Sequence, residues 1–175
     1  LNLFIINLLN NNSLSELLIF NFFAVLIFLF FNFPKAKIFL GDGGSYFLGA
    51  FVALSAINTS LENPNISPFY FCILLFYLFF EVFFSFFRKL LKEKISPIRP
   101  DDKHLHMLLY KYLFKNNNDK IKSNYSVSII INSIYFVLIL PATLMMESGL
   151  FCKYYSILFF AIYIFSYIKL HRKNL

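Results

Sequence analysis

Five apolar segments, each close to the length needed to cross a lipid bilayer, dominate this chain of 175 residues. A spanning helix needs about 20 mostly apolar residues, because backbone polar groups find no water inside a bilayer. The segments that fit are Leu14–Phe33, Ser45–Leu61, Pro68–Phe87, Ser126–Met146 and Phe151–Leu170. We therefore expect an all-α fold, a polytopic membrane bundle with about five transmembrane helices.

The composition agrees with a lipid environment. Hydrophobic residues make up 59% of the chain and charged residues only 14%, and the mean hydropathy is +0.67. A soluble domain of this size keeps too large a surface fraction to bury so much apolar area. The two cysteines, Cys72 and Cys152, lie in apolar stretches and predict neither a disulfide framework nor a metal site. We expect a single integral-membrane domain over residues 1–175.

Two features modify this pattern. Pro141 removes a backbone donor from the fourth segment and is expected to kink it. The first stretch, LNLFIINLL, is too short to span a bilayer and is followed by NNNS. Because it also lacks the basic flank and cleavage site of a signal peptide, we interpret it as the tail of a helix. The chain is then expected to be the C-terminal part of a longer protein.

The basic residues predict the orientation. Of the 16 Lys and Arg residues, 15 fall in three groups, residues 35–37, 88–122 and 169–173, that five spans place on one side. The opposite loops hold Glu62, Glu147 and Lys153. The positive-inside rule identifies the basic side as the cytoplasm, so the charge of +7 predicts no nucleic-acid partner. The cytoplasmic side then carries a glycine-rich turn and a long loop, residues 88–125.

Asp42 lies in this turn, in the sequence GDGGS, just before the second span. Glycines let a backbone approach a ligand closely, and the free N–H groups of a helix N-terminus favour an anion. Mg²⁺ prefers one or two carboxylates together with phosphate oxygens. The stretch is therefore a candidate site for a metal and a phosphate; the alternative is a plain turn in which Asp42 is a solvated cap.

The long loop contains SPIRPDDKHLHMLLYKYL, Ser96–Leu113, in which five ionisable residues fall close together: Asp101, Asp102, Lys103, His104 and His106. In an extended backbone the two histidines point to the same side, whereas a helix would splay them apart. They could form a metal pair or contact a phosphate. Two histidines are an incomplete zinc site, so a metal transporter or membrane metalloenzyme ranks lower. The remaining alternative is a polar loop whose histidines merely decorate an amphipathic helix.

Glu81 is an ionisable residue inside the third apolar segment, in FYLFFEVFFSFF. Such a residue in a spanning helix indicates function by default. Helical spacing puts it on one face with Tyr77, Ser85 and Arg88. The alternative is structural: Glu81 pairs with a basic residue near the helix end, or is neutral.

Three blocks together resemble a known family. They are NFPKAKIFLGDGGSYFLG (Asn32–Gly49), FFEVFFSFFRK (Phe79–Lys89) and PDDKHLHMLLYK (Pro100–Lys111). In this order and spacing they are similar to the polyprenyl-phosphate N-acetylhexosamine-1-phosphate transferases, glycosyl transferase family 4. That family includes WecA-type enzymes and the phospho-N-acetylmuramoyl-pentapeptide transferase of peptidoglycan synthesis. Beyond Lys111 the resemblance rests on hydropathy alone.

The resemblance implies an enzyme of the bacterial inner membrane with a cytoplasmic active site. It would transfer a sugar-1-phosphate from a UDP-N-acetylhexosamine donor to undecaprenyl phosphate, initiating a lipid-linked cell-envelope glycan, with Mg²⁺ or Mn²⁺ as cofactor. The motif match makes Asp42 the metal ligand, and gives His104 and His106 contacts to the donor's diphosphate and sugar. Asp101 belongs to the same motif, and Glu81 is a further substrate-binding candidate. Location alone adds three cations for the diphosphate: Lys37, Arg99 and Lys103.

Three departures qualify this expectation. Many relatives have a further histidine at Met107, and many carry Asp at Glu81. The upstream aspartate-rich motif of the family is not found in these 175 residues, so we expect the isolated fragment to be inactive. A catalytically inactive membrane scaffold of the same fold is the alternative function. The PDxxHLH pattern is more similar to the WecA-like, surface-polysaccharide branch (lipopolysaccharide among its products), and a homodimer is compatible with such a bundle.

Overall fold

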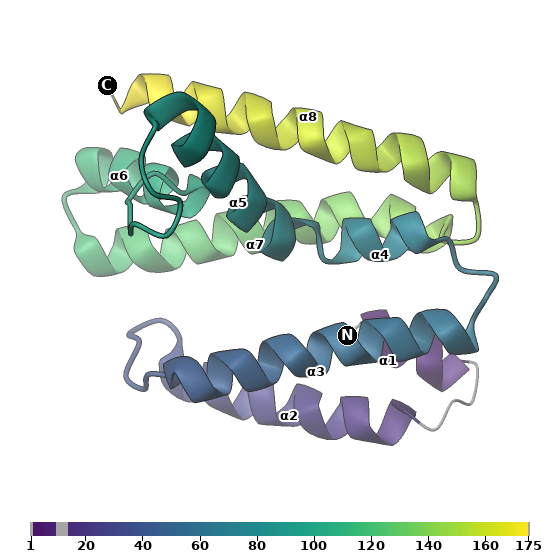
Figure 1. Ribbon diagram of the computed structural model, residues 1–175. Helices are drawn as coiled ribbons and strands as arrows, with labels where there is room; N and C mark the ends of the chain where they lie inside the picture. The colour runs from purple at the N-terminus through teal and green to yellow at the C-terminus, as the bar shows by residue number, and fades with distance from the viewer. Residues whose placement is uncertain (1, 10–13, 175) are drawn as a thin grey trace. The chain divides into compact units, whose positions relative to one another are not determined.

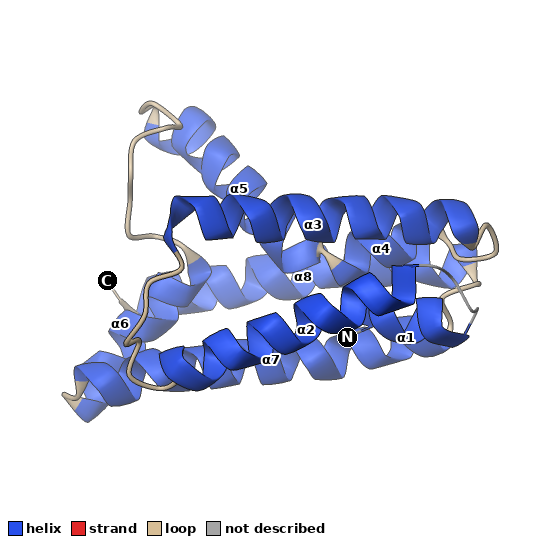
Figure 2. Cartoon of the chain, turned by 90° about the horizontal axis from the view of Figure 1, so that it is seen from below, coloured by secondary structure: helices blue, strands red, loops and turns tan. Residues whose placement is uncertain are grey.

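The computed structural model describes residues 2–9 and 14–174, apart from the side chains of residues 9, 14 and 92. Every regular element in this part of the chain is a helix, which confirms the all-α prediction (Figures 1 and 2). In chain order the elements are α1 (Asn2–Leu9), α2 (Leu14–Asn32), α3 (Gly41–Glu62), α4 (Pro68–Leu74), α5 (Phe76–Phe87), the π-helix η1 (Arg88–Glu93), α6 (Leu105–Asn117), α7 (Lys120–Leu144) and α8 (Gly149–Lys173). The chain divides into two compact units, Leu1–Pro68 and Phe69–Leu175.

The first unit consists of α1, α2 and α3, with α1 packed against both longer helices. Leu3 and Ile6 of α1 are buried, and the Asn7 amide donates a hydrogen bond of 2.7 Å to the Thr59 hydroxyl of α3. The stretch predicted as the tail of a helix is therefore helical, and it helps to join the unit. The NNNS sequence that follows it lies outside the described residues.

The second unit packs α5 and α6 against the long helices α7 and α8 (Figure 1). An aromatic cluster joins α5 to α8: the Phe80 ring lies 4.6 Å from Phe160 and 4.8 Å from Tyr163, edge to face in both pairs. Such pairs add stability beyond the area they bury. This contact holds the polar face of α5 in a fixed position relative to α8.

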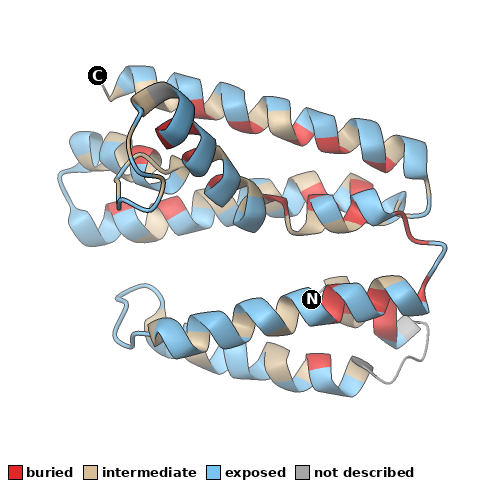
Figure 3. Ribbon diagram, in the orientation of Figure 1, coloured by how far each residue is buried: buried red, intermediate tan, exposed pale blue. Residues whose placement is uncertain are grey.

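The predicted spans match the helices closely. Within residues 2–9 and 14–174, four helices are long and apolar enough to cross a membrane, namely α2, α3, α7 and α8. Many of their apolar side chains are exposed, for example Phe20 and Phe30 of α2 and Phe165 of α8 (Figure 3). A lipid-facing surface accounts for this exposure, because lipid tails are as apolar as these side chains.

The third predicted span is broken, which the sequence did not indicate. Counted as one span it would be the fifth, but Pro68–Leu74 and Phe76–Leu91 meet at an angle of 76°. The hydroxyl group of Tyr135, from α7, lies 2.7 Å from the carbonyl oxygen of Ile73 and 2.9 Å from that of Leu74. A break inside a membrane exposes backbone carbonyls, and this hydroxyl satisfies them.

The predicted disturbance at Pro141 falls near a helix end. Pro141 lies in the last turn of α7, which continues without a break to Leu144. Its own carbonyl accepts a hydrogen bond of 3.1 Å from Met145 N–H. The proline still removes the one bond that its N–H would have donated to the Val137 carbonyl, but only three helical residues follow it, so any bend would redirect little of α7.

Candidate functional site

The stretch predicted as a glycine-rich turn before the second span is itself helical: GDGGS forms the start of α3, which begins four residues before the predicted span at Ser45. Gly41 begins the helix with a φ of +72°, a left-handed conformation that favours glycine. Asp42 lies in the first turn and is exposed. The N-cap residue, Leu40, supplies no side-chain hydrogen bond to this turn. An exposed carboxylate therefore lies within the first turn of a helix whose N-terminus has no side-chain cap, and not in a turn before the helix.

The histidine loop of the second unit, residues 94–104, connects η1 to α6. His104 is the N-cap residue of α6 and is extended (φ −68°, ψ 153°), and His106 lies in the first helical turn. Their rings stack with centroids 5.7 Å apart and planes 14° from parallel. The two rings are brought together because the helix starts between them.

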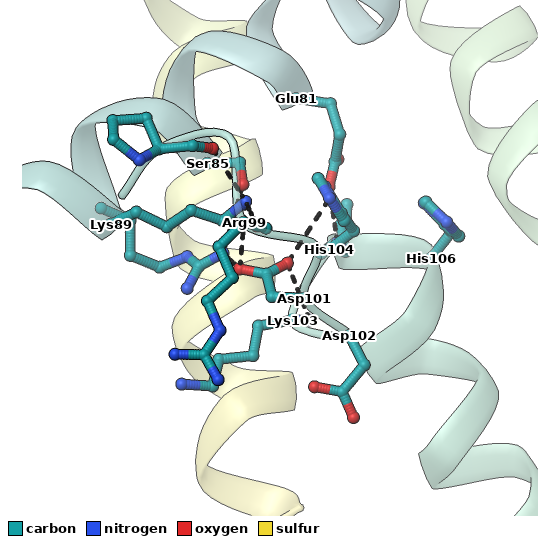
Figure 4. Close-up of polar contacts among 12 residues, drawn as sticks. Glu81, Ser85, Lys89, Arg99, Asp101, Asp102, Lys103, His104 and His106 are labelled. Atoms are coloured by element: carbon teal, nitrogen blue, oxygen red, sulfur yellow. Dashed lines mark hydrogen bonds and ion pairs between the residues drawn. The ribbon is translucent and has the colours of Figure 1, made fainter. Parts of the chain in front are cut away.

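Glu81 is the centre of the polar contacts at this loop (Figure 4). Although it lies in an apolar helix, its carboxylate accepts three hydrogen bonds: 3.0 Å from His104 Nδ1, 2.8 Å from Leu105 N–H and 2.8 Å from the Tyr163 hydroxyl. The bond to Leu105 caps the N-terminus of α6 from a different helix. The structural alternative predicted a basic partner near the helix end, whereas the partners here are a histidine, a backbone amide and a tyrosine.

Arg88 and Lys89 hold the other end of the loop. The Arg88 guanidinium bonds Asp101 Oδ2 at 2.5 Å and Glu93 Oε1 at 2.7 Å. The Lys89 ammonium donates to the Arg99 carbonyl at 2.7 Å and lies 3.7 Å from Asp101 Oδ2. We call Arg88, Lys89, Glu93 and Asp101 the anchor cluster. Both basic side chains are buried.

Sequence reasoning missed this structural task of the two basic residues. It placed Arg88 on the same helical face as Glu81 and Ser85, and all three are indeed buried. That stripe was the available signal, because a buried cation needs a buried anion. Nothing in the spacing identified Asp101, 13 residues further on, as its partner.

The charges of the anchor cluster shift its carboxyl groups. Burial alone would raise the pKa of Asp101, but the hydrogen bond and the charge of Arg88, with the charge of Lys89, bring that pKa below its ordinary value. The pKa of Glu93 is lowered chiefly by the hydrogen bond from Lys103, and also by Arg88. Both carboxyl groups are therefore held in their charged form.

The remaining candidates differ in their surroundings. The Lys103 ammonium pairs with Glu93 at 2.8 Å and is half exposed. The Tyr77 hydroxyl lies 3.5 Å from His106 Nδ1. Arg99 is exposed in the loop, and Lys37 is exposed in the first unit. The structure thus brings Glu81, Asp101, Lys103, His104 and His106 together in one unit, whereas Asp42 and Lys37 belong to the other.

Among the described residues, no group of three or more His, Cys, Asp or Glu side chains is arranged to hold a metal ion. Asp42 offers one exposed carboxylate. This donor suits Mg²⁺ or Mn²⁺ bound mainly through phosphate oxygens and water, since Mg²⁺ usually keeps several waters and few protein ligands.

Comparison with known proteins gives sequence matches over part of the chain. The sequence model of glycosyl transferase family 4 matches residues 1–60, a segment that includes the GDGGS turn. The apolar helices and this match indicate a multi-pass membrane protein, and the family resemblance is confirmed over part of the chain.

Two curated relatives have names that are more specific than that of the family. The "Undecaprenyl-phosphate alpha-N-acetylglucosaminyl 1-phosphate transferase" of Thermotoga maritima is 37% identical over 93 residues, which cover 53% of this chain and 30% of the relative. The "Probable undecaprenyl-phosphate N-acetylglucosaminyl 1-phosphate transferase" of Bacillus subtilis is 33% identical over 91 residues, 51% of this chain and 25% of the relative. The matched part of the chain thus spans less than a third of either relative. No solved structure matches the chain.

Proposed function

We propose that this chain forms part of a polyprenyl-phosphate sugar-phosphate transferase, with its reacting groups at the cytoplasmic face of a bacterial inner membrane. The observation that carries the proposal is the histidine loop, which is capped by the membrane-embedded Glu81 and tied down by Arg88. It supports the same function as the names of the two relatives. The donor would be a UDP-N-acetylhexosamine and the acceptor undecaprenyl phosphate.

The proposed reaction is a phosphoryl transfer between two anions. An oxygen of the acceptor phosphate forms a bond to the sugar-bearing phosphorus of the donor, and the bond from that phosphorus to the UMP oxygen breaks. The products are a lipid-linked sugar diphosphate and UMP. Catalysis of such a step depends on positioning and on neutralising charge rather than on covalent help from the protein.

The chain's residues would divide this work. Asp42 would hold Mg²⁺ or Mn²⁺, which when bound neutralises phosphate charge. The uncapped start of α3 adds N–H groups that favour an anion. In the histidine loop, Lys103 and Arg99 add positive charge at the protein surface. These groups match the needs of a diphosphate.

The test is a matched pair of substitutions in the full-length protein reconstituted in lipid nanodiscs. Asp42→Asn removes the ligand charge and should lower UMP release from UDP-N-acetylglucosamine by about 10³-fold, as expected for loss of a key electrostatic group. Asp119→Asn makes the same chemical change at the N-cap of α7, where Asn also caps well, and should leave the rate unchanged.

Thermal stability and membrane insertion should be the same for both variants, because Asp42 is exposed and has no ion-pair partner among the described residues. Turnover of Asp42→Asn at the wild-type rate would refute its assignment as metal ligand. A wild-type protein that is inactive with a panel of UDP-sugars would favour the scaffold instead.

A further inference from the structure

His104, the last residue of the histidine loop, and His106, in the first turn of α6, have different surroundings. Both ring nitrogens of His104 face carboxylates of its own protein: Nδ1 lies 3.0 Å from Glu81 Oε1, and Nε2 lies 3.5 Å from Asp101 Oδ1. A carboxylate oxygen accepts hydrogen bonds and a ring N–H donates them, so the contact with Glu81 needs a proton on Nδ1, and the contact of Nε2 with Asp101 is attractive when Nε2 also carries a proton. The ring spans two acidic side chains that come from different segments.

These two carboxylates are themselves fixed in place. Glu81 also accepts from Leu105 N–H and from the Tyr163 hydroxyl of α8. Asp101 is paired with the buried Arg88 guanidinium. Each carboxylate is about nine-tenths buried. For His104 to turn toward a ligand, Glu81 would lose one of its three hydrogen bonds and Asp101 the ring contact at 3.5 Å, both in a largely buried site, which is costly.

His106 is in the opposite situation. It is exposed, and its Nδ1 lies 3.5 Å from the Tyr77 hydroxyl. No hydrogen bond to its Nε2 is found within the described part of the chain. Figure 4 shows its ring set apart from the dashed contacts that join Glu81, His104 and Asp101. The stacking of the His104 ring on one side, 5.7 Å away, limits how His106 can turn.

We propose that the two histidines have separate tasks: His104 is a positioning residue clamped between Glu81 and Asp101, and His106 presents Nε2 to the diphosphate of a nucleotide-sugar. This inference rests on the proposed function for the ligand, and on the contacts alone for the clamp. It departs from the family resemblance, which implied a substrate contact for both rings. Glu81 becomes a positioning residue as well, because it holds His104 and the start of α6 with one carboxylate.

A crossed set of substitutions tests this division. The Asn amide nitrogen lies close to where Nδ1 lies in histidine, whereas the longer Gln side chain brings its amide nitrogen near the place of Nε2. His104→Asn keeps the donor toward Glu81, so kcat should stay within about tenfold of wild type, whereas His104→Gln and His104→Ala should lose about 100-fold. At the other ring the order reverses: His106→Gln should be tolerated, and His106→Asn should lose about 100-fold and raise the KM for UDP-N-acetylglucosamine.

A second readout does not depend on activity. Trypsin can cut the loop after Lys94 or Lys103 once the loop detaches from its contacts; the bond after Arg99 resists trypsin because Pro100 follows it. In the full-length protein in nanodiscs, His104→Gln and Glu81→Leu should speed this cleavage at least about tenfold, because each loses a hydrogen bond of the clamp. His106→Asn should be cut at the wild-type rate.

The outcomes separate the two proposals. If Gln works better than Asn at position 104, or if His104→Gln and Glu81→Leu leave tryptic cleavage unchanged, the clamp is wrong. If His106→Asn binds UDP-N-acetylglucosamine as tightly as wild type by calorimetry, His106 is not the ligand-facing ring. If the wild type transfers no sugar phosphate at all, the proposed function fails, and the cleavage pattern still decides for or against the clamp.

Discussion

The glycine-rich stretch and the histidine loop differ in the surroundings of the acidic side chain that lies at the start of the adjoining helix. Each places an acidic side chain at the start of a helix, α3 or α6. At α3 the acid is Asp42, which is exposed and has no ion-pair partner among the described residues. At α6 it is Glu81, which comes from another helix, is buried, and accepts three hydrogen bonds from its own protein.

The difference indicates which acid is available for a ligand. A carboxylate whose oxygens are already satisfied has little to offer a metal ion, whereas one that meets only water can be neutralised from outside. The Asp42 carboxylate is therefore available to bind a ligand, whereas the histidine loop is held in place by hydrogen bonds and ion pairs within its own unit. Substitutions in the first should change function without changing stability, and substitutions in the second should change both.

The largest effect on stability is expected at the anchor cluster. Arg88→Met leaves the largely buried Asp101 carboxylate without its main partner and removes one of the two cations that bind Glu93, and should lower the free energy of unfolding by about 3 kcal/mol. Chemical unfolding in mixed micelles would measure it. Lys111→Ala removes an ion pair to Asp102 in which both side chains are well exposed, and should change stability by less than about 0.5 kcal/mol. If Arg88→Met and Lys111→Ala lowered the free energy of unfolding equally, the anchor cluster would stabilise the protein no more than an exposed ion pair does.

The next largest effect is expected from acid, which should weaken the ion pair that attaches the histidine loop through Asp101. The folded-state pKa of Asp101 is lowered by Arg88, so this carboxyl contributes stability that is present above its unfolded pKa, near 4. That contribution is lost as the pH falls through the folded value, because the proton then competes with Arg88. We expect tryptic resistance of the loop, after exposure to acid at graded pH, to fall below about pH 4. In Asp101→Asn the resistance should be low at pH 7 and change little on acidification; an unaltered acid profile would contradict the assignment.

A smaller effect is expected at the break between α4 and α5. Tyr135→Phe removes only the hydroxyl that bonds the carbonyls of Ile73 and Leu74, at a cost of about 1 kcal/mol. The same unfolding assay would measure it. Tyr154→Phe is a control, since that tyrosine is exposed on α8. A loss at position 154 as large as that at 135 would mean that the hydroxyl does not stabilise the break.

The sequence predicted the helices because long apolar runs leave few alternatives in lipid. α3 and α8 extend the predicted spans by a few residues at both ends and α7 does so at its start, since polar ends such as Lys120 and Lys173 remain helical at the interface; α7 ends at Leu144, before the predicted Met146. The break at Leu75 could not be predicted, because no glycine or proline marks it and its partner, Tyr135, lies 60 residues away.

For the candidate site, too, the sequence predicted the residues but not the long-range contacts that surround them. Residue types and spacing singled out Glu81, Asp101, His104 and His106, and the structure brings these four together. Which of them face inward could not be read from spacing, because that depends on Arg88, Lys89 and Tyr163. The pairing of His104 with carboxylates on both sides is a long-range outcome of how α5, the loop and α8 pack.

Whether the bent pair α4–α5 crosses the bilayer decides on which side of the membrane the following basic residues emerge. If it crosses the bilayer, the glycine-rich turn and the histidine loop open at the same leaflet. If it re-enters instead, the 10 basic residues of 88–122 emerge opposite Lys35 and Lys37, a division of charge that the positive-inside rule disfavours. An enzyme that joins a soluble donor to a lipid acceptor needs both groups of side chains at one leaflet. The distribution of basic residues therefore favours a crossing by this bent pair, whose halves meet at 76°.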